Sequence, residues 1–207
     1  MNKIPSRYWL PLGLLAAIAL AFLFLLTLMP QQVADKDTAP AADKDTTEDV
    51  PIGGPFTLTD TQGVSRKAAD FHGQHLLLFF GYTFCPDICP VTLQTLSNAV
   101  EAMDKKGLKV TPVFITLDPE RDNVDAMGHY LANFHPRFVG LTGTTEQIAV
   151  AAKAYHVYYA KAGEDADYLV DHSAIVFFMG PDGKYLAHFR HSDSAETMAK
   201  GMSNRID

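Results

Sequence analysis

Cys85 and Cys89 are the two thiols of this 207-residue chain, and they are four residues apart in the segment Cys-Pro-Asp-Ile-Cys-Pro. The segment lies between an apolar run at 75–81 and a helix-like pattern at 90–106. The start of a helix stabilises a thiolate, which is both the nucleophile of disulfide exchange and a metal ligand. The pair can therefore bind a soft metal ion, exchange electrons as a dithiol, or form a structural disulfide. The disulfide is least favoured, because closing so small a loop stabilises little.

His172 is the candidate third ligand among eight histidines. It stands in the segment Asp171-His172-Ser173, immediately before the apolar run 174–179. Two thiolates and one imidazole form a soft ligand set of low coordination number, which suits Cu(I) and tolerates Cu(II) when a further ligand joins. A structural zinc site fits less well, because zinc usually takes four ligands and the sequence offers no convincing fourth.

The elements that must position these residues follow from hydrophobic periodicity and turn signals. Their order, a βαβ unit followed by a helix and a final hairpin, predicts an α/β, thioredoxin-like fold with an extra N-terminal β-hairpin. We expect strands at 56–59, 64–66, 75–81, 110–117, 138–141, 156–160, 174–179 and 184–190, and helices at 90–106, 123–133, 144–155 and 194–203.

This fold gives the position of His172 a chemical meaning. In a thioredoxin, the loop before the strand expected at 174–179 faces the cysteine loop and usually carries a cis-proline that positions disulfide substrates. The chain has no proline from Tyr168 to Met179, and a histidine takes that place. The substitution favours a metal site over plain disulfide exchange.

The N-terminal region predicts a membrane anchor at 10–29. This stretch carries no charge, and about 20 helical residues span roughly 30 Å, the thickness of the hydrocarbon core. Lys3 and Arg7 precede it, so residues 1–9 are expected in the cytoplasm and the rest outside. The length of the run and the lack of an Ala-x-Ala site favour an uncleaved anchor over a signal peptide. Without an Arg- and Ser-rich presequence, we expect a bacterial inner membrane with the domain in the periplasm.

Residues 30–50 are expected to form a flexible linker, and residues 51–207 a single domain. The linker repeats Ala-Asp-Lys-Asp-Thr at 34–38 and 42–46 and has almost no apolar side chain to bury. Because the first seven residues contribute +2 to the net charge of −7, the exported part carries −9. So acidic a domain is not expected to bind nucleic acid.

Three segments together resemble one protein family. They are Tyr-Thr-Phe-Cys-Pro-Asp-Ile-Cys-Pro at 82–90, Asp-Pro-Glu-Arg-Asp at 118–122 and Val-Asp-His-Ser at 170–173. The chain is similar in these to the Sco/SenC family of copper-binding cytochrome c oxidase assembly proteins, over nearly the whole exported domain. An N-terminal membrane anchor is also usual in that family. One departure is Asn123-Val124, where Thr-Pro would be expected at a helix start.

The resemblance implies that Cys85, Cys89 and His172 bind copper. It further implies a membrane-anchored copper chaperone that takes copper from a periplasmic donor and helps to build the CuA centre of cytochrome c oxidase subunit II. The alternative is a thiol-disulfide reductase that keeps the CuA cysteines reduced. In that case Cys85 and Cys89 are the catalytic redox pair, and His172 tunes the thiolate pKa. A peroxiredoxin fits poorly, because Thr83 is two residues before Cys85 and no proline lies from His72 to Cys85.

Several other residues have weaker claims to a functional role. Asp118 could orient a ligand or meet a partner, but could equally cap a loop. Asp171 could support His172 or cap a turn, and Asp87 could add negative charge between the cysteines or cap the helix. His188 and His191 are expected at a solvent-facing strand end, and the acidic loop 164–167 is expected to be solvated, although a partner would approach there. The methionines form no Met-rich copper cluster and are expected either to pack or to lie at the surface: Met103, Met127, Met179, Met198 and Met202.

Overall fold

The computed structural model describes residues 51–163, 165 and 167–206. The cytoplasmic N-terminus predicted at 1–9, the anchor predicted at 10–29 and the linker predicted at 30–50 lie outside the described residues. Among those that are described, no helix has the length and apolar character needed to cross a membrane. The described residues all fall within one compact unit, Asp49–Asp207.

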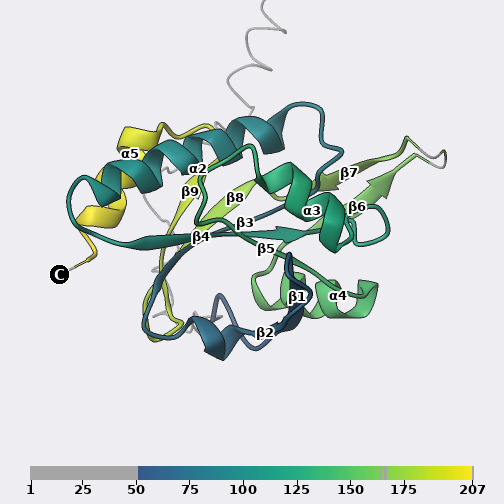
Figure 1. Ribbon diagram of the computed structural model, residues 1–207, viewed down its shortest axis with the longest axis horizontal. Coiled ribbons are helices and arrows are strands. Elements are labelled where there is room, and N and C mark those ends of the chain that lie inside the picture. Colours follow the sequence, from purple (N-terminus) through teal and green to yellow (C-terminus); the bar gives the residue numbers. More distant parts are fainter. Residues whose placement is uncertain (1–50, 164, 166, 207) are drawn as a thin grey trace, which may run out of the picture. The chain divides into compact units, whose positions relative to one another are not determined.

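A seven-stranded mixed sheet forms the centre of this unit (Figure 1). The strand order is β2-β1-β5-β4-β3-β8-β9, in which β3, β4 and β5 are parallel to one another and the other pairs are antiparallel. The run Leu76–Gly81 of β3 is buried throughout, as expected for a central strand covered on both faces. The strands are β1 (Thr57–Asp60), β2 (Ser65–Lys67), β3 (His75–Gly81), β4 (Val110–Thr116), β5 (Val139–Thr142), β8 (Ile175–Met179) and β9 (Tyr185–Arg190).

Helices cover both faces of the sheet. Figure 1 shows α2 (Ile88–Asp104) and α5 (Ala195–Ser203) together above the sheet, and α4 (Thr145–Ala154) below it. The others are α3 (Val124–Leu131), which follows β4, and the 3-10 helix η2 (Ala68–Phe71). Asn123, the departure from the family pattern, is the N-cap of α3, where its side-chain oxygen accepts the Ala126 N–H at 2.9 Å. Asparagine is among the preferred N-cap residues, so this departure leaves the helix start intact.

A second, two-stranded sheet carries one of the predicted ligands. It is an antiparallel hairpin of β6 (Tyr159–Ala162) and β7 (Leu169–His172), and it makes no strand pairing with the seven-stranded sheet within the described residues. The prediction of a strand at 156–160 is wrong at its start, because α4 ends there in a Schellman motif. His156 takes φ 54°, and the Val157 N–H donates to the Ala152 carbonyl at 2.8 Å. The strand β7 was not predicted.

The βαβ unit, the following helices and the final hairpin confirm the predicted α/β, thioredoxin-like arrangement with an extra N-terminal hairpin.

The start of α2 determines where Cys89 lies in the helix. The expected helix start at Pro90 is wrong by two residues, since α2 begins at Ile88. Proline is tolerated in the first turn, where its missing N–H has no partner to lose. Cys89 therefore lies inside the first turn of the helix rather than before it.

Gly81 sets how closely α2 approaches the sheet. A Cβ on Gly81 would lie 2.8 Å from Cys89 Sγ and 2.9 Å from the Phe114 ring. We expect Gly81→Ala to lower the free energy of unfolding by about 1–3 kcal/mol, since overpacking a dense core forces neighbours to shift. Denaturant titration measures this.

Gly128→Ala is the matched control, because a Cβ on Gly128 of α3 would meet its nearest atom, in Thr61, at 3.9 Å. That substitution should stabilise the protein by about 0.5–1 kcal/mol through helix propensity. Equal effects of the two substitutions would contradict the close approach at Gly81.

Candidate metal centre

The two cysteines lie where β3 passes into α2, with different access to solvent. Cys89 is fully buried in the first turn of α2, whereas Cys85 is partly exposed in the preceding loop. Both are free thiols. The Cys89 N–H donates to Cys85 Sγ at 3.4 Å, so Cys85 lies over the free N–H groups at the start of the helix.

His172 ends β7 and faces the buried thiol. Its Nε2 lies 3.7 Å from Cys89 Sγ, and its Nδ1 lies 3.2 Å from the Ser173 carbonyl oxygen. A carbonyl oxygen only accepts, so Nδ1 carries the proton and the lone pair of Nε2 points toward Cys89. The rings of Phe79 and Tyr82 meet the imidazole edge-on, each at a centroid distance of 6.1 Å, and restrict its rotation.

The sulfur–nitrogen distance is the one that two ligands of a single ion would have. With a metal–sulfur bond of about 2.3 Å and a metal–nitrogen bond of about 2.0 Å, two ligands at a tetrahedral or trigonal angle lie roughly 3.6 Å apart. Across the described ranges, no three His, Cys, Asp or Glu side chains already converge into a complete ligand set. Cys89 and His172 are thus two potential ligands at a suitable separation, and the described side chains do not bring a third to the same point.

The thiols differ in acidity because of where they lie. The hydrogen bond with Cys89 and the N–H groups of Asp87, Cys89 and Ile88 lower the pKa of Cys85 to about 5, against the opposing effect of burial. The same interaction with Cys85, together with burial, raises the pKa of Cys89. Burial lowers the pKa of His172. At neutral pH the site therefore holds one thiolate, one thiol and one neutral imidazole.

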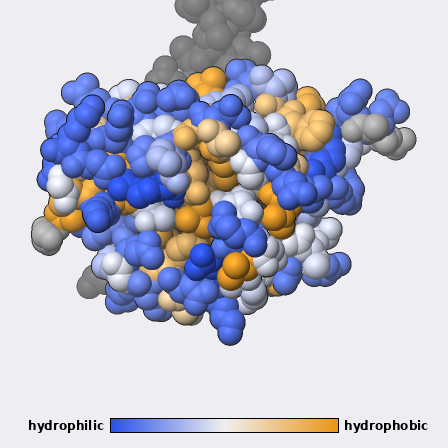
Figure 2. Space-filling view, viewed as in Figure 1, coloured by the Kyte–Doolittle hydropathy of each residue, from blue (hydrophilic) through white to orange (hydrophobic). Residues whose placement is uncertain are grey.

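A shallow pocket of about 310 Å³ opens between the cysteine loop and β7. Cys85, Ile88, Leu169 and His172 are among its lining residues. Large apolar side chains are exposed around it, and Figure 2 shows an apolar patch over the first turns of α2 on this face of the molecule. These exposed residues are Phe84, Ile88, Val91 and Leu169. The centre is therefore reached from an apolar surface.

The residues with weaker claims mostly lie apart from the thiols. The exposed Asp87 and Asp171 line the pocket, but Asp118 is buried and accepts the Tyr168 hydroxyl at 2.6 Å. His188 on β9 pairs with the Tyr185 hydroxyl, and His191 is exposed after β9. In the loop 164–167 the described residues are Asp165 and Asp167, both exposed. Of the two places expected for the methionines, packing or surface, all five occupy the first, since they are buried in the core: Met103, Met127, Met179, Met198 and Met202.

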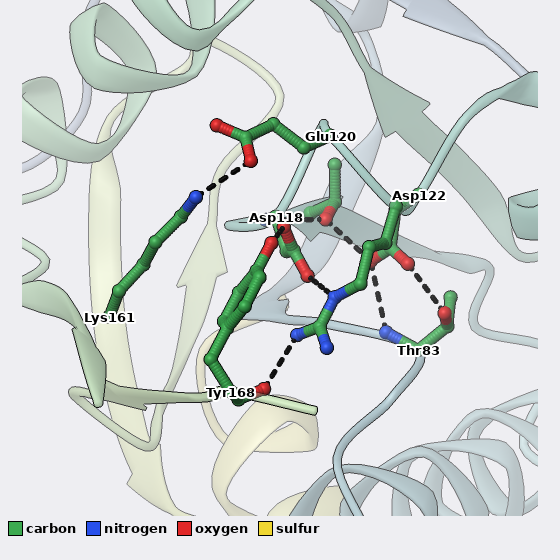
Figure 3. A network of polar contacts seen from close by, with 8 residues as sticks. Thr83, Asp118, Glu120, Asp122, Lys161 and Tyr168 are labelled. Atoms are coloured by element: carbon green, nitrogen blue, oxygen red, sulfur yellow. Dashed lines mark hydrogen bonds and ion pairs between the residues drawn. The ribbon is translucent and has the colours of Figure 1, made fainter. Parts of the chain in front are cut away.

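Asp122 is a residue whose role the sequence did not reveal. Its buried carboxylate accepts the Thr83 N–H at 2.9 Å, the Thr83 hydroxyl and the Thr116 hydroxyl at 2.6 Å (Figure 3). Burial raises the pKa of this carboxyl, and the three donors oppose the increase. Asp122 therefore fixes the start of the cysteine loop, two residues before Cys85. The Asp-Pro-Glu-Arg-Asp segment is a signal, but its pattern does not indicate that Asp118 and Asp122 turn inward while Glu120 does not.

Known proteins match both the sequence and the fold. The family model described as SCO1/SenC matches residues 44–207. The human SCO2 homolog, a mitochondrial protein, is 49% identical over 158 residues, which cover 74% of this chain and 59% of the human protein. The chain spans about three fifths of the length of the first curated relatives that it matches.

Two solved structures of copper-bound proteins are similar to this chain. Arabidopsis thaliana ScoI is 39% identical with a TM-score of 0.72, and the match covers 75% of this chain and 98% of that one. Bradyrhizobium japonicum ScoI is also 39% identical, with a TM-score of 0.69 and coverage of 75% and 99%. By the extent of the family match and the identity to these relatives, the chain belongs to the SCO1/SenC family.

Proposed function

We propose that this protein is a copper chaperone in which Cys85, Cys89 and His172 bind the metal. The observation that carries the proposal is the 3.7 Å approach of His172 Nε2 to Cys89 Sγ, with the imidazole lone pair directed at the sulfur. Cys85, the other cysteine, is the proposed third ligand, and its partial exposure allows its sulfur to turn toward Cys89 and His172. The two ScoI relatives with copper bound support the choice of metal, and so does the preference of soft thiolates for Cu(I).

Copper is the cargo here, and the asymmetry of the site suits its transfer. Cys89 is buried and holds a proton that the incoming ion displaces, while Cys85 is already ionised and accessible. A donor or acceptor can therefore exchange ligands at Cys85 while Cys89 and His172 retain the ion. The exposed apolar residues around the pocket offer such a protein a surface on which to dock.

The wider setting of the proposal comes from the family and from the N-terminal sequence. The acceptor is the CuA domain of cytochrome c oxidase subunit II, and the source is a periplasmic copper donor. An anchor at 10–29 would hold residues 51–207 in the periplasm through the linker, within reach of a partner at the membrane.

The copper site is tested by titrating the full chain, reduced and in detergent, with Cu(I) against a competing chelator. We expect one copper per chain, and an affinity at least about 100-fold lower in His172→Ala, since losing a ligand should exceed the 10–100-fold cost of losing an outer partner. His188→Ala, which removes an exposed histidine of β9, should bind like the wild type. One tightly bound copper in His172→Ala would show that this ligand set is wrong.

A thiol-disulfide reductase is the second candidate, favoured by the low pKa of the partly exposed Cys85. The Cys85 thiolate would attack a partner's disulfide, forming a mixed disulfide and releasing one partner sulfur as a thiolate. The Cys89 sulfur, passing its proton to that thiolate, would then attack Cys85 Sγ and displace the second partner sulfur as a thiolate. The products are a Cys85–Cys89 disulfide, one partner thiol and one partner thiolate, with two electrons passed to the partner.

The acidity of Cys85 has its own test. We expect the rate of alkylation by iodoacetamide to rise through a pH near 5 and to stay level up to pH 8, because Cys85 is ionised above its pKa. Cys89→Ala removes the side-chain donor that lowers the pKa of Cys85 most, so the midpoint should move upward. Cys85→Ser should react slowly at pH 7. A wild-type midpoint near 8.5, the ordinary thiol value, would contradict the geometry.

The two functions are separated in cells that lack the protein. If it delivers copper, both His172→Ala and Cys85→Ser should fail to restore CuA assembly, measured as the near-infrared absorbance of the purified oxidase. If it acts as a reductase, His172→Ala should restore assembly and Cys85→Ser should not. His188→Ala is the control for expression and export.

A further inference from the structure

The loop Asp118–Asp122, between β4 and α3, lies between the two segments that carry the proposed ligands. On one side is the cysteine loop, and on the other is the β6–β7 hairpin that ends at His172. Figure 3 shows Asp118, Glu120 and Asp122 of this loop pointing toward Tyr168, Lys161 and Thr83 respectively. The loop therefore contacts both ligand segments at once.

The hairpin needs such a contact, because strand pairing does not fix it to the main sheet. Its two strands pair with each other, and no ladder joins them to the seven-stranded sheet in the described ranges. Cys89, by contrast, is fixed by α2 and by its packing at Gly81. The relative position of the two ligands thus depends on what holds the hairpin.

Arg121 contacts both segments with a single side chain. Its guanidinium carbon lies 3.7 Å from the ring centroid of Tyr168 and 4.6 Å from that of Phe84, the residue before Cys85. Its Nη2 donates to the Tyr168 carbonyl at 2.9 Å, and its Nε donates to Asp118 Oδ2 at 2.5 Å. The planar cation is therefore in contact with one aromatic ring from the thiol loop and one from the hairpin.

The same hairpin is held by two further contacts. The Tyr168 hydroxyl donates to Asp118 Oδ1 at 2.6 Å, so Asp118 binds both Arg121 and Tyr168. Lys161 of β6 pairs with Glu120 at 2.7 Å and lies 4.5 Å from the Tyr168 ring centroid. Lys161 of β6 and Tyr168, the residue before β7, thereby attach the hairpin to the Asp118–Asp122 loop.

We propose that Arg121 is a positioning residue: by joining Phe84 of the thiol loop to Tyr168 of the hairpin, it sets the position of His172 relative to Cys85 and Cys89. The inference rests on the proposed copper site and adds a determinant of its geometry. It requires arginine rather than lysine, since only a planar guanidinium can stack on two rings while donating from separate nitrogens.

The test uses Arg121→Lys in the full chain, loaded with Cu(II) and compared with the wild type. Electron paramagnetic resonance reports nitrogen hyperfine coupling from His172, and visible absorption reports thiolate-to-copper charge transfer. We expect the charge-transfer band to persist, the nitrogen coupling to weaken, and copper affinity to fall about 10- to 100-fold, the range for groups that orient a metal ligand. A loss of stability alone would not weaken the nitrogen coupling while leaving the charge-transfer band in place.

Arg66→Lys is the matched control. Arg66 pairs at 2.7 Å with Asp60, a carboxylate as buried as Asp118, at the β1–β2 edge of the sheet. It should leave both spectra unchanged. Tyr168→Leu removes the same contact from the hairpin side. If circular dichroism shows that Arg121→Lys does not fold, Tyr168→Leu is the variant that tests the proposal. Tyr168→Leu should reproduce the loss of nitrogen coupling.

His172→Ala, measured alongside, separates this inference from the proposed function. Suppose that His172→Ala loses the nitrogen coupling, whereas Arg121→Lys and Tyr168→Leu fold and keep both the coupling and wild-type copper affinity. The positioning role is then overturned and the copper site stands. If His172→Ala keeps the wild-type coupling and affinity, the ligand set is wrong and both proposals fail.

Discussion

The contact between Cys89 Sγ and His172 Nε2 is the constraint on which the rest of the centre depends. It joins residues 83 positions apart in the chain at a separation of 3.7 Å. One partner lies in the rigid interior, because Cys89 is buried in the first turn of a helix packed on the central strand. The other lies at the end of a hairpin outside the main sheet. The two halves of the centre are thus held by different kinds of interaction.

The rigid half relies on dense packing and a buried carboxylate. Gly81 lets the Cys89 sulfur reach the end of β3, and Asp122 uses three hydrogen bonds to hold Thr83 and Thr116 around the start of the cysteine loop. A buried carboxylate is costly unless its oxygens are satisfied, so it fixes the backbone that satisfies it. The loop that carries Cys85 consequently leaves the sheet in a defined direction, while Cys85 itself keeps its access to solvent.

Much of the fold and of the candidate centre could be predicted from the sequence. The remaining features could not be predicted, for physical reasons. The apolar run of β3 and the turn signals between β8 and β9 predict the fold, and His172 is a predicted ligand because it stands where a thioredoxin usually has a proline. Strand β7 was missed because Leu-Val-Asp-His is short and owes its structure to pairing with β6, which no local pattern reveals. Arg121 was missed because the segment that contains it shows spacing but not which side chain stacks on Phe84 and Tyr168.

The division into a rigid half and a tethered half also bears on the proposed transfer of copper. A chaperone has to hold its cargo firmly enough to carry it and loosely enough to release it. A site fixed on all sides by core packing would meet only the first requirement. Here the hairpin with His172 is held in part by contacts of exposed side chains, such as the Lys161–Glu120 ion pair, which are individually weak. A partner that docks on the apolar surface beside Leu169 would act on those contacts directly, and could loosen the imidazole without disturbing the core that holds Cys89.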